Sequence, residues 1–156
     1  MATSTLEKIR RIIAEGNDMT IATIREDGFP QATTVSYIGD GIDICFGTGA
    51  DSQKAKNIGR CNKVSLTINL PYADWEHIAG ISAAGIAQRV TDAAELGRFG
   101  ALTFAKFPQV LKYVPQGGNA ALAVFRIRLS VASLLDYTQG FGHTEFADLR
   151  QSAHAA

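Results

Sequence analysis

Two glycine turns in the first third of the chain restrict its topology more than any other feature. Asp27-Gly28 separates the apolar runs Met19–Ile24 and Gln31–Ile38, and an Asp-Gly pair between such runs is a strong hairpin signal. Gly39-Asp40-Gly41 then leads directly into a third run, Ile42–Gly47. Parallel strands would need a long crossover between them, and these short turns leave no room for one. The pattern therefore predicts three successive antiparallel strands, a meander.

The rest of the chain adds three strand patterns and a few short helices. Val64–Leu70 alternates apolar and polar residues, which is typical of a half-buried strand. Further strands are predicted over His77–Val90 and Ala121–Val131, and helices over Leu6–Ile13 (capped by Thr3 or Ser4), over 51–61, from Thr91-Asp92 through Phe104, and over 108–113. Because closure removes exposed strand edges, we expect a mainly β fold with flanking helices: a six-stranded antiparallel barrel, closed or nearly closed.

Two of the predicted strands carry information about their faces. His77–Val90 is rich in alanine and glycine, which indicates close backbone approach or a bulge. In Ala121–Val131, Phe125 to Val131 alternate onto one face, and Arg126, Arg128 and Ser130 fall on the other. Because the sheet has so many small residues on one side, we expect another chain or a flat ligand to cover it.

Composition excludes several classes of protein. The 156 residues are 46% hydrophobic and 19% charged, which fits one soluble domain; we assign it to 1–150, with a flexible tail at 151–156. Fifteen basic and fifteen acidic residues balance, so no nucleic acid or anionic membrane partner is implied. The apolar runs are too short to span a bilayer, and Met1–Arg11 does not resemble a signal peptide. Cys45 and Cys61 lack disulfide or metal-site spacing. We therefore expect a cytoplasmic protein without a metal.

The stretch Phe46-Gly47-Thr48-Gly49-Ala50-Asp51-Ser52-Gln53-Lys54 has the order of an anion-binding turn. A strand leads through two glycines to the start of a helix, where free N–H groups and the helix dipole favour a phosphate. Lys54 and Lys56 add positive charge beside it. The stretch is not a Walker A loop, because Lys and Ser or Thr do not follow the second glycine. Ordinary helix capping by Asp51 or Ser52 is the competing interpretation.

With these residues laid out, the chain resembles the pyridoxamine 5′-phosphate oxidase-like family of split β-barrels that bind flavin mononucleotide (FMN). The resemblance covers about Leu6 to Leu149 and rests on motifs that occur in the family's order. These are Met19-Thr20-Ile21-Ala22-Thr23, Asp27-Gly28-Phe29-Pro30-Gln31, Ala32-Thr33-Thr34-Val35-Ser36-Tyr37, Phe46-Gly47-Thr48, Ser52-Gln53-Lys54-Ala55, Val64-Ser65-Leu66-Thr67-Ile68, Trp75, Gly80-Ile81-Ser82-Ala83-Ala84-Gly85-Ile86-Ala87 and Leu135-Asp136-Tyr137-Thr138-Gln139-Gly140-Phe141-Gly142-His143.

The resemblance implies a homodimer with two flavin sites at the subunit interface. The ring edge would be held by the second strand, the ribityl side approached by Gly47 and Thr48, and the phosphate bound by Ser52, Gln53 and Lys54. The second-strand residues are Gln31, Ala32, Thr33, Thr34, Val35 and Ser36.

The chain departs from the oxidase at two charged positions of that strand. The oxidase has Arg and Lys where this chain has Gln31 and Ser36, and Arg-Lys where it has Gln53-Lys54. We therefore expect an FMN-dependent oxidoreductase or flavin reductase that acts on a small molecule, with NAD(P)H as a possible donor, and not a true pyridoxamine 5′-phosphate oxidase. The alternatives are a deazaflavin-dependent reductase, with Lys54, Lys56 and Arg60 as its few basic residues, or a non-catalytic flavin- or haem-binding module.

Several single residues have two interpretations each. His143, in a glycine-flanked segment, is the candidate catalytic proton donor or else an ordinary turn histidine. Trp75 either covers the flavin or plugs a barrel end, and Tyr137 either contacts the ring from the partner or packs in the dimer. Arg126 and Arg128 either meet a phosphate or belong to a solvated or ion-paired face.

Overall fold

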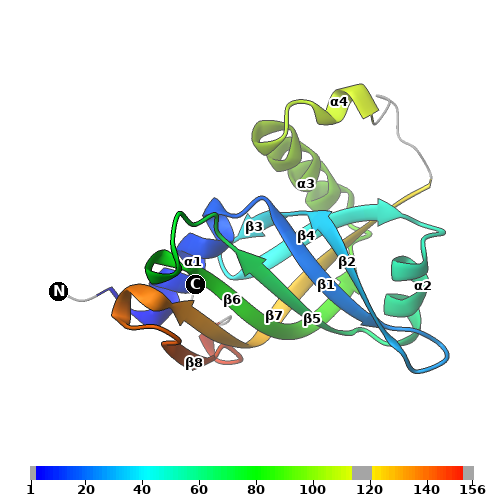
Figure 1. Cartoon of the computed structure of the whole chain (residues 1–156). Coiled ribbons are helices and arrows are strands. Elements are labelled where there is room, and N and C mark those ends of the chain that lie inside the picture. The colour runs from blue at the N-terminus through cyan, green and yellow to red at the C-terminus, as the bar shows by residue number, and fades with distance from the viewer. Residues whose placement is uncertain (1–2, 114–120, 153–156) are drawn as a thin grey trace.

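The computed structural model describes residues 3–113 and 121–152, and one antiparallel sheet dominates it (Figure 1). This part of the chain contains eight strands, two more than the sequence predicted. They are β1 (Asp18–Ile24), β2 (Pro30–Ser36), β3 (Ile38–Asp40), β4 (Asp43–Gly49), β5 (Lys63–Asn69), β6 (Ala79–Arg89), β7 (Leu122–Asp136) and β8 (Thr144–Asp148).

The two outer strands of the curled sheet, β2 and β3, are consecutive in the chain. The strand order is β2-β1-β5-β6-β7-β4-β3. Strand β4 pairs with the first half of β7, and β8 pairs with its second half. The predicted meander is therefore wrong: β2 pairs with β1, whereas β3 pairs with β4 at the opposite end of the order. Tyr37 alone separates β2 from β3, and its buried hydroxyl donates to the carbonyl of Ile13 at 2.8 Å. This anchor ends one strand and starts the other, and the mainly β, split-barrel fold class is confirmed.

A bulge interrupts the long β6–β7 pair, as the small residues predicted. Ala84 pairs with Val131 but Gly85 pairs with Leu129, so Ser130 is the extra residue. A Cβ on Gly85 would lie 2.4 Å from the carbonyl oxygen of Arg128, which confirms the close approach. The bulge also reverses the alternation: Leu129 is buried before it and Ala132 after it. Val131 therefore does not share the buried face, contrary to prediction.

Helix α1 (Thr5–Glu15) supplies one side of the core. Ser4, rather than Thr3, is its N-cap and forms a reciprocal capping box with Glu7. Its isoleucines pack against the inward residues of the sheet, where the rings of Phe46 and Phe125 stack with their centroids 5.6 Å apart. The largest fully buried side chains include Ile9, Ile12, Ile13, Met19, Ile21, Ile44, Phe46, Ile68, Ile81, Ile127 and Leu134. Burial of these groups is the main favourable term in folding.

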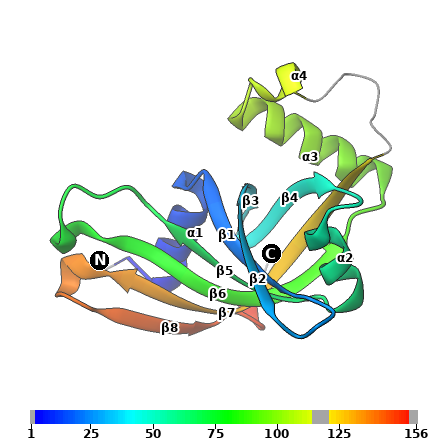
Figure 2. The same ribbon diagram turned by 45° about the vertical axis from the view of Figure 1, so that its right-hand side comes forward.

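The other helices lie outside the barrel (Figures 1 and 2). Helix α2 (Gln53–Arg60) follows β4, whereas α3 (Ala93–Lys106) and the short α4 (Val110–Tyr113) stand over β3 and β4. Asp92 caps α3 by accepting the Glu95 N–H at 2.9 Å. Among the described helices, none has the length and apolar character needed to cross a membrane. Residues 153–156, most of the predicted tail, lie outside the described residues.

Candidate functional site

The predicted anion-binding turn forms between β4 and α2. Ser52 is the N-cap: its Oγ accepts the Ala55 N–H at 3.1 Å, while its own N–H donates to the Gly49 carbonyl at 3.0 Å. Thr48 Oγ1 lies 3.2 Å from Ser52 Oγ, so two of the predicted site residues are in contact. Asp51 is exposed and does not cap. The turn therefore presents two hydroxyls at the positive end of a helix dipole.

Two lysines illustrate what distinguishes a site from a structural contact. Lys54 and Lys106 are both half-buried, and burial lowers the pKa of each below 10.5. Lys106 Nζ is satisfied: it donates to the carbonyls of Gly16 at 2.6 Å and Tyr37 at 3.1 Å, and lies 4.4 Å from the Tyr37 ring centroid. Lys54 has no hydrogen bond or ion pair with any residue that the structure describes, and burial alone shifts its pKa. A half-buried ammonium without a counter-charge favours binding of an anion.

A buried asparagine connects the turn to the predicted flavin strand. Asn57 is 0% exposed; its Nδ2 donates to Thr23 Oγ1 at 3.0 Å and Gln31 Oε1 at 3.2 Å. Its Oδ1 accepts from Gln53 Nε2 at 2.8 Å. Both Gln31 and Gln53 were predicted site residues, so Asn57 joins two motifs that are far apart in the sequence. The Gln31 carbonyl is thereby occupied, whereas its amide N–H₂ donates to no described residue and is available to a ligand.

The six residues predicted at the flavin edge, 31–36, all lie on β2, an outer strand of the sheet. Its only partner strand in the described sheet is β1, so the backbone groups on its other edge are not paired within the sheet. Ser36 Oγ donates to Asp18 Oδ1 at 2.8 Å, and Thr34 Oγ1 lies 3.5 Å from Thr20 Oγ1. Gly47, predicted to approach the ribityl side, is half-buried beside Phe99 of α3.

His143 lies in the turn between β7 and β8, and this end of both strands is at the opposite end of the molecule from α2 (Figures 1 and 2). His143 Nε2 is 3.0 Å from Glu145 Oε1. The hydrogen bond from the Thr5 hydroxyl, followed by that from His143, holds the pKa of Glu145 below its usual value. Within one chain the structure therefore does not bring His143 to Ser52 and Lys54.

Trp75 does not plug the barrel. It is 66% exposed in a 3-10 turn, η1 (Trp75–His77), and its ring centroid lies 6.0 Å from that of Phe141, which is 75% exposed. Phe141 also meets Tyr137 edge-on at 5.4 Å. The plug prediction fails because the isoleucines of α1 already pack in the core. These three rings form an exposed aromatic cluster: Trp75, Tyr137 and Phe141.

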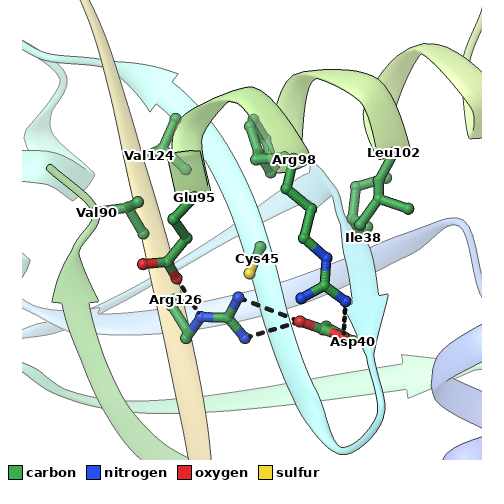
Figure 3. A pocket seen from close by; sticks show the side chains of 10 residues that line it. Ile38, Asp40, Cys45, Val90, Glu95, Arg98, Leu102, Val124 and Arg126 are labelled. Carbon is green, nitrogen blue, oxygen red and sulfur yellow. Dashed lines mark hydrogen bonds and ion pairs between the residues drawn. The ribbon is translucent and has the colours of Figure 1, made fainter. Parts of the chain in front are cut away.

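Arg126 belongs to an ion-pair network under α3 and not to a phosphate site (Figure 3). Its guanidinium donates to Glu95 at 2.6 Å, Asp43 at 3.1 Å and Asp40 at 3.2 Å, and Arg98 also donates to Asp40 at 2.9 Å. Although burial opposes it, these carboxylates raise the pKa of Arg126. Arg128 is exposed. The ion-paired interpretation of Arg126 is thus confirmed.

The network closes one side of a small pocket between α3 and the outer face of β3, β4 and β7 (Figure 3). Cys45 points into it, and burial raises the pKa of its thiol to about 11. The thiol is therefore protonated and behaves as a small apolar group. This pocket contains none of the predicted flavin residues.

Comparisons with known proteins agree with this architecture. A haem-binding protein from Mycobacterium smegmatis superposes with a TM-score of 0.81 at 23% identity; the match covers 95% of this chain but 59% of that one, so this chain spans less than two thirds of its length. A haem storage protein from Vibrio cholerae gives 0.65 at 15% identity, covering 78% and 87%. General stress protein 26 from Bacillus anthracis gives 0.71 at 18% identity, covering 92% and 98%. At such identities these matches show a shared fold.

Sequence comparison assigns the family. No functionally curated protein matches the chain. The family profile described as pyridoxamine 5′-phosphate oxidase, however, matches residues 5–134 of the 156. This match includes the turn at Ser52, the strand at Gln31 and the buried Asn57 that connects them. The chain therefore belongs to the pyridoxamine 5′-phosphate oxidase family.

Proposed function

We propose that the protein binds FMN at the interface of a homodimer and acts as an oxidoreductase on a small molecule, with NAD(P)H as donor. The observation that carries the proposal is Lys54, a half-buried ammonium without a carboxylate partner in the described chain, beside the Ser52-capped start of α2. A phosphomonoester supplies the counter-charge that Lys54 lacks. Family membership supports the choice of a flavin phosphate over other anions.

The residues present fit this cofactor in two places. Lys54, the Ser52 hydroxyl and the first N–H groups of α2 would hold the phosphate. The free amide of Gln31 and the unpaired edge of β2 would bind the polar edge of the ring, with Asn57 fixing the orientation of Gln31. The flavin, when bound, supplies the redox chemistry, and the protein's part is to bind, orient and tune it.

The same residues argue against pyridoxamine 5′-phosphate oxidation. Gln31 and Ser36 are neutral where the oxidase carries cations, and Ser36 donates to Asp18, so a carboxylate lies at this end of the strand. Arg60, counted among the basic residues for a deazaflavin tail, donates instead to the Ile24 carbonyl at 2.6 Å, at the far end of α2. FMN therefore fits the turn better than a longer polyanionic cofactor.

FMN titration followed by flavin fluorescence tests the assignment. Lys54→Ala should weaken FMN binding by about 1.5–3 kcal/mol, the range for a hydrogen bond to a charged group. Lys56→Ala is the matched control, because it removes the same charge from an exposed position of the same helix. Equal effects of the two substitutions would reduce the role of Lys54 to general electrostatics, and no effect of either would refute the phosphate site.

Reduction of bound flavin by NADH or NADPH, followed by its loss of visible absorption, tests the oxidoreductase assignment. Enzymatic turnover requires reduction by at least one donor at a rate that exceeds reduction of free FMN. Tight FMN binding without reduction by either donor would leave a flavin-binding module in place of an enzyme.

Haem binding is the second candidate, because two structures of the same fold are haem proteins by name. In this chain, His77 and His143 each bond a carboxylate through one ring nitrogen, at 2.6 Å to Asp74 and 3.0 Å to Glu145. Such support is common for metal-ligating histidines, and the exposed aromatic cluster lies within two residues of both. A haemin titration of wild type, His77→Ala and His143→Ala tests whether either histidine is a haem ligand. Loss of the Soret shift in one variant supports haem binding, and an unchanged shift in both variants refutes these two ligands.

A further inference from the structure

Four uncharged side chains connect the turn at Ser52 to the outer strand β2 through consecutive hydrogen bonds. Gln53 and Asn57 are one turn apart on α2, so their side chains meet. The strand register places Thr23 of β1 opposite Gln31 of β2. Asn57 joins the two pairs at the β1–β2 hairpin, beside which α2 lies (Figures 1 and 2). We call these four residues, Gln53, Asn57, Thr23 and Gln31, the amide relay.

Both ends of the amide relay have a defined hydrogen-bonding polarity. A primary amide carries two N–H donors and one carbonyl acceptor. Asn57 directs both donors to one side, toward Thr23 at 3.0 Å and Gln31 at 3.2 Å. On the other side its carbonyl oxygen accepts from Gln53 at 2.8 Å. Gln31 therefore turns its carbonyl oxygen inward, which leaves its N–H₂ group as a donor to a ligand. Gln53 turns its N–H₂ group inward, which leaves its carbonyl oxygen as an acceptor.

The two ends of the relay cannot change polarity independently. If Asn57 alone turned over, its oxygen would face the Gln31 oxygen and its nitrogen the Gln53 nitrogen, and both bonds would be lost. If Gln31 alone turned over, two N–H₂ groups would face each other. Asn57 is 0% exposed and Thr23 is 1% exposed, so water does not replace a lost partner, and such a loss is costly. Every bond survives only if all three amides reverse together, since the Thr23 hydroxyl can donate or accept.

This polarity bears on which groups can hold a phosphate. A phosphate dianion only accepts hydrogen bonds, so donors bind it, and the outward carbonyl oxygen of Gln53 would repel it. The Ser52 hydroxyl, the Lys54 ammonium and the first N–H groups of α2 are donors that take no part in the relay. The donors at the turn are thus separate from the Gln53 side chain, which belongs to the relay.

We propose that Asn57 is a positioning residue that sets the ligand specificity of the site through the relay. It holds Gln31 as a donor, so the ring edge of the ligand must offer an acceptor there, such as a carbonyl oxygen. The phosphate is bound without the Gln53 side chain, which the family resemblance had implied as a ligand. A ring edge that offers only N–H groups to Gln31 is rejected, because all three amides would have to reverse. The inference rests on the proposed function, since it takes FMN, whose pyrimidine ring carries carbonyl groups, as the ligand.

Titration with FMN and with riboflavin, which has the same ring but no phosphate, tests the proposal. Asn57→Leu and Gln31→Leu should each raise the dissociation constants of both ligands about fivefold, the effect of a lost neutral hydrogen bond. The double variant should bind no more weakly than Gln31→Leu alone, because Asn57 acts through Gln31. Thr23→Val is the matched control: it removes one relay bond but leaves the polarity set by Gln53, so both constants should stay nearly unchanged. Multiplicative effects of the Asn57 and Gln31 substitutions overturn the proposal.

Gln31→Glu distinguishes a donor from an acceptor at the ring edge. The carboxylate still accepts from Asn57 but has no N–H for the ligand, so riboflavin affinity should fall about tenfold or more. Unchanged or tighter riboflavin binding would mean that the ring donates to residue 31, and it contradicts the proposal. Gln53→Met should weaken FMN and riboflavin binding equally, because it acts only on the relay. A loss confined to FMN would make Gln53 a phosphate ligand and overturn the proposal.

Nuclear magnetic resonance of the FMN-free protein separates this inference from the proposed function, and it applies even if Asn57→Leu fails to fold. In the relay as described, the side-chain N–H₂ hydrogens of Asn57 contact the Thr23 side chain and exchange slowly with water. In the reversed relay they face Gln53. Contact with Thr23 in a protein that binds no FMN upholds the polarity of the relay and refutes the flavin site. Contact with Gln53 instead, or rapid exchange, overturns the inference whether or not FMN binds.

Discussion

The two parts of the outer sheet face differ in the charged side chains that they carry. Under α3, Arg126 gathers Glu95, Asp40 and Asp43 within 3.2 Å, and Arg98 adds a second cation. The other part of the outer face is formed by β2, β1, β5, β6, the second half of β7 and β8. Two rows of paired residues cross it, one from Thr34 to Phe146 and one from Ala32 to Asp148, and Asp148 is their one ionisable residue. Where α3 covers the sheet, ion pairs between the helix and the strands hold it in place, whereas the uncovered part carries mostly small and hydroxyl side chains.

Charged groups hold α3 against the sheet. None of its residues is fully buried, so the apolar contact that usually holds a surface helix is narrow here. Glu95 and Arg98 hold the first half of α3, and its last residue, Lys106, donates to the carbonyls of Gly16 and Tyr37. The contrast between the covered and uncovered parts of the sheet can be tested by substitutions that affect one region and spare the other.

Arg126→Ala should have the largest effect. It leaves three partly buried carboxylates without their shared cation, so we expect a loss of about 3 kcal/mol in the free energy of unfolding, the lower end of the range for a broken buried ion pair. Arg128→Ala, two residues along the same strand but exposed, should change it by less than about 0.5 kcal/mol. Urea denaturation of both variants measures the difference. Similar losses would show that the network does not hold α3.

Gly85→Ala should have the next largest effect on stability. The new Cβ would lie 2.4 Å from the Arg128 carbonyl oxygen, and backbone has to move to relieve that contact. We expect a loss of about 2 kcal/mol, as for other overpacked interiors, visible as a lower Tm. A stable variant would mean that the bulge can shift to accommodate the methyl group.

Gly97→Ala, the same change in α3, should have the opposite sign. No atom lies within 4 Å of the added Cβ, and alanine is favoured over glycine inside a helix by about 0.5–1 kcal/mol. We expect a modest rise in Tm. A fall would indicate that a second chain packs against the outer side of α3, which would remove the contrast between the two faces.

The last prediction concerns the two half-buried lysines, Lys54 of α2 and Lys106 of α3. The pKa of Lys54 is lowered from 10.5 by burial, so Lys54 loses its proton at a lower pH than an exposed lysine. FMN affinity should therefore decline as pH rises toward 10.5, because the phosphate loses its counter-charge. Lys54→Ala should abolish that part of the decline and Lys106→Met should retain it. An identical pH profile in wild type and Lys54→Ala would contradict the role of Lys54.

Local signals allowed most of the fold to be predicted. Asp27-Gly28 and Gly39-Asp40-Gly41 act within a few residues, and the alternation in Val64–Leu70 needs no distant partner. The place of β3 could not be predicted, because it depends on Tyr37 bonding to α1, a contact between segments 24 residues apart. The strand β8 has five residues, three of them polar, and its pattern resembles that of a loop.

The candidate site could likewise be predicted where its residues are consecutive in the sequence, and not where they come from different segments. The turn at Ser52 was visible because strand, glycines and capping residue are consecutive. Asn57 was missed because a polar residue in an amphipathic helix is usually exposed, and only the fold shows that it is buried against Gln31. Lys54 and Lys106 could not be separated from sequence, since what distinguishes them is whether carbonyl groups from other segments lie within reach.

Tyr37, the single residue between β2 and β3, also affects how the molecule unfolds. Its hydroxyl donates to a carbonyl of α1 and its own carbonyl accepts from Lys106 of α3. Its two neighbours are the last residue of β2 and the first residue of β3, the two outer strands of the sheet. Neither outer strand can therefore peel away without pulling on the other and on both helices. Ordinarily the edges of a sheet fray first and exchange their amide hydrogens fastest; here β2 and β3 should exchange together and late, as one cooperative unit with the core.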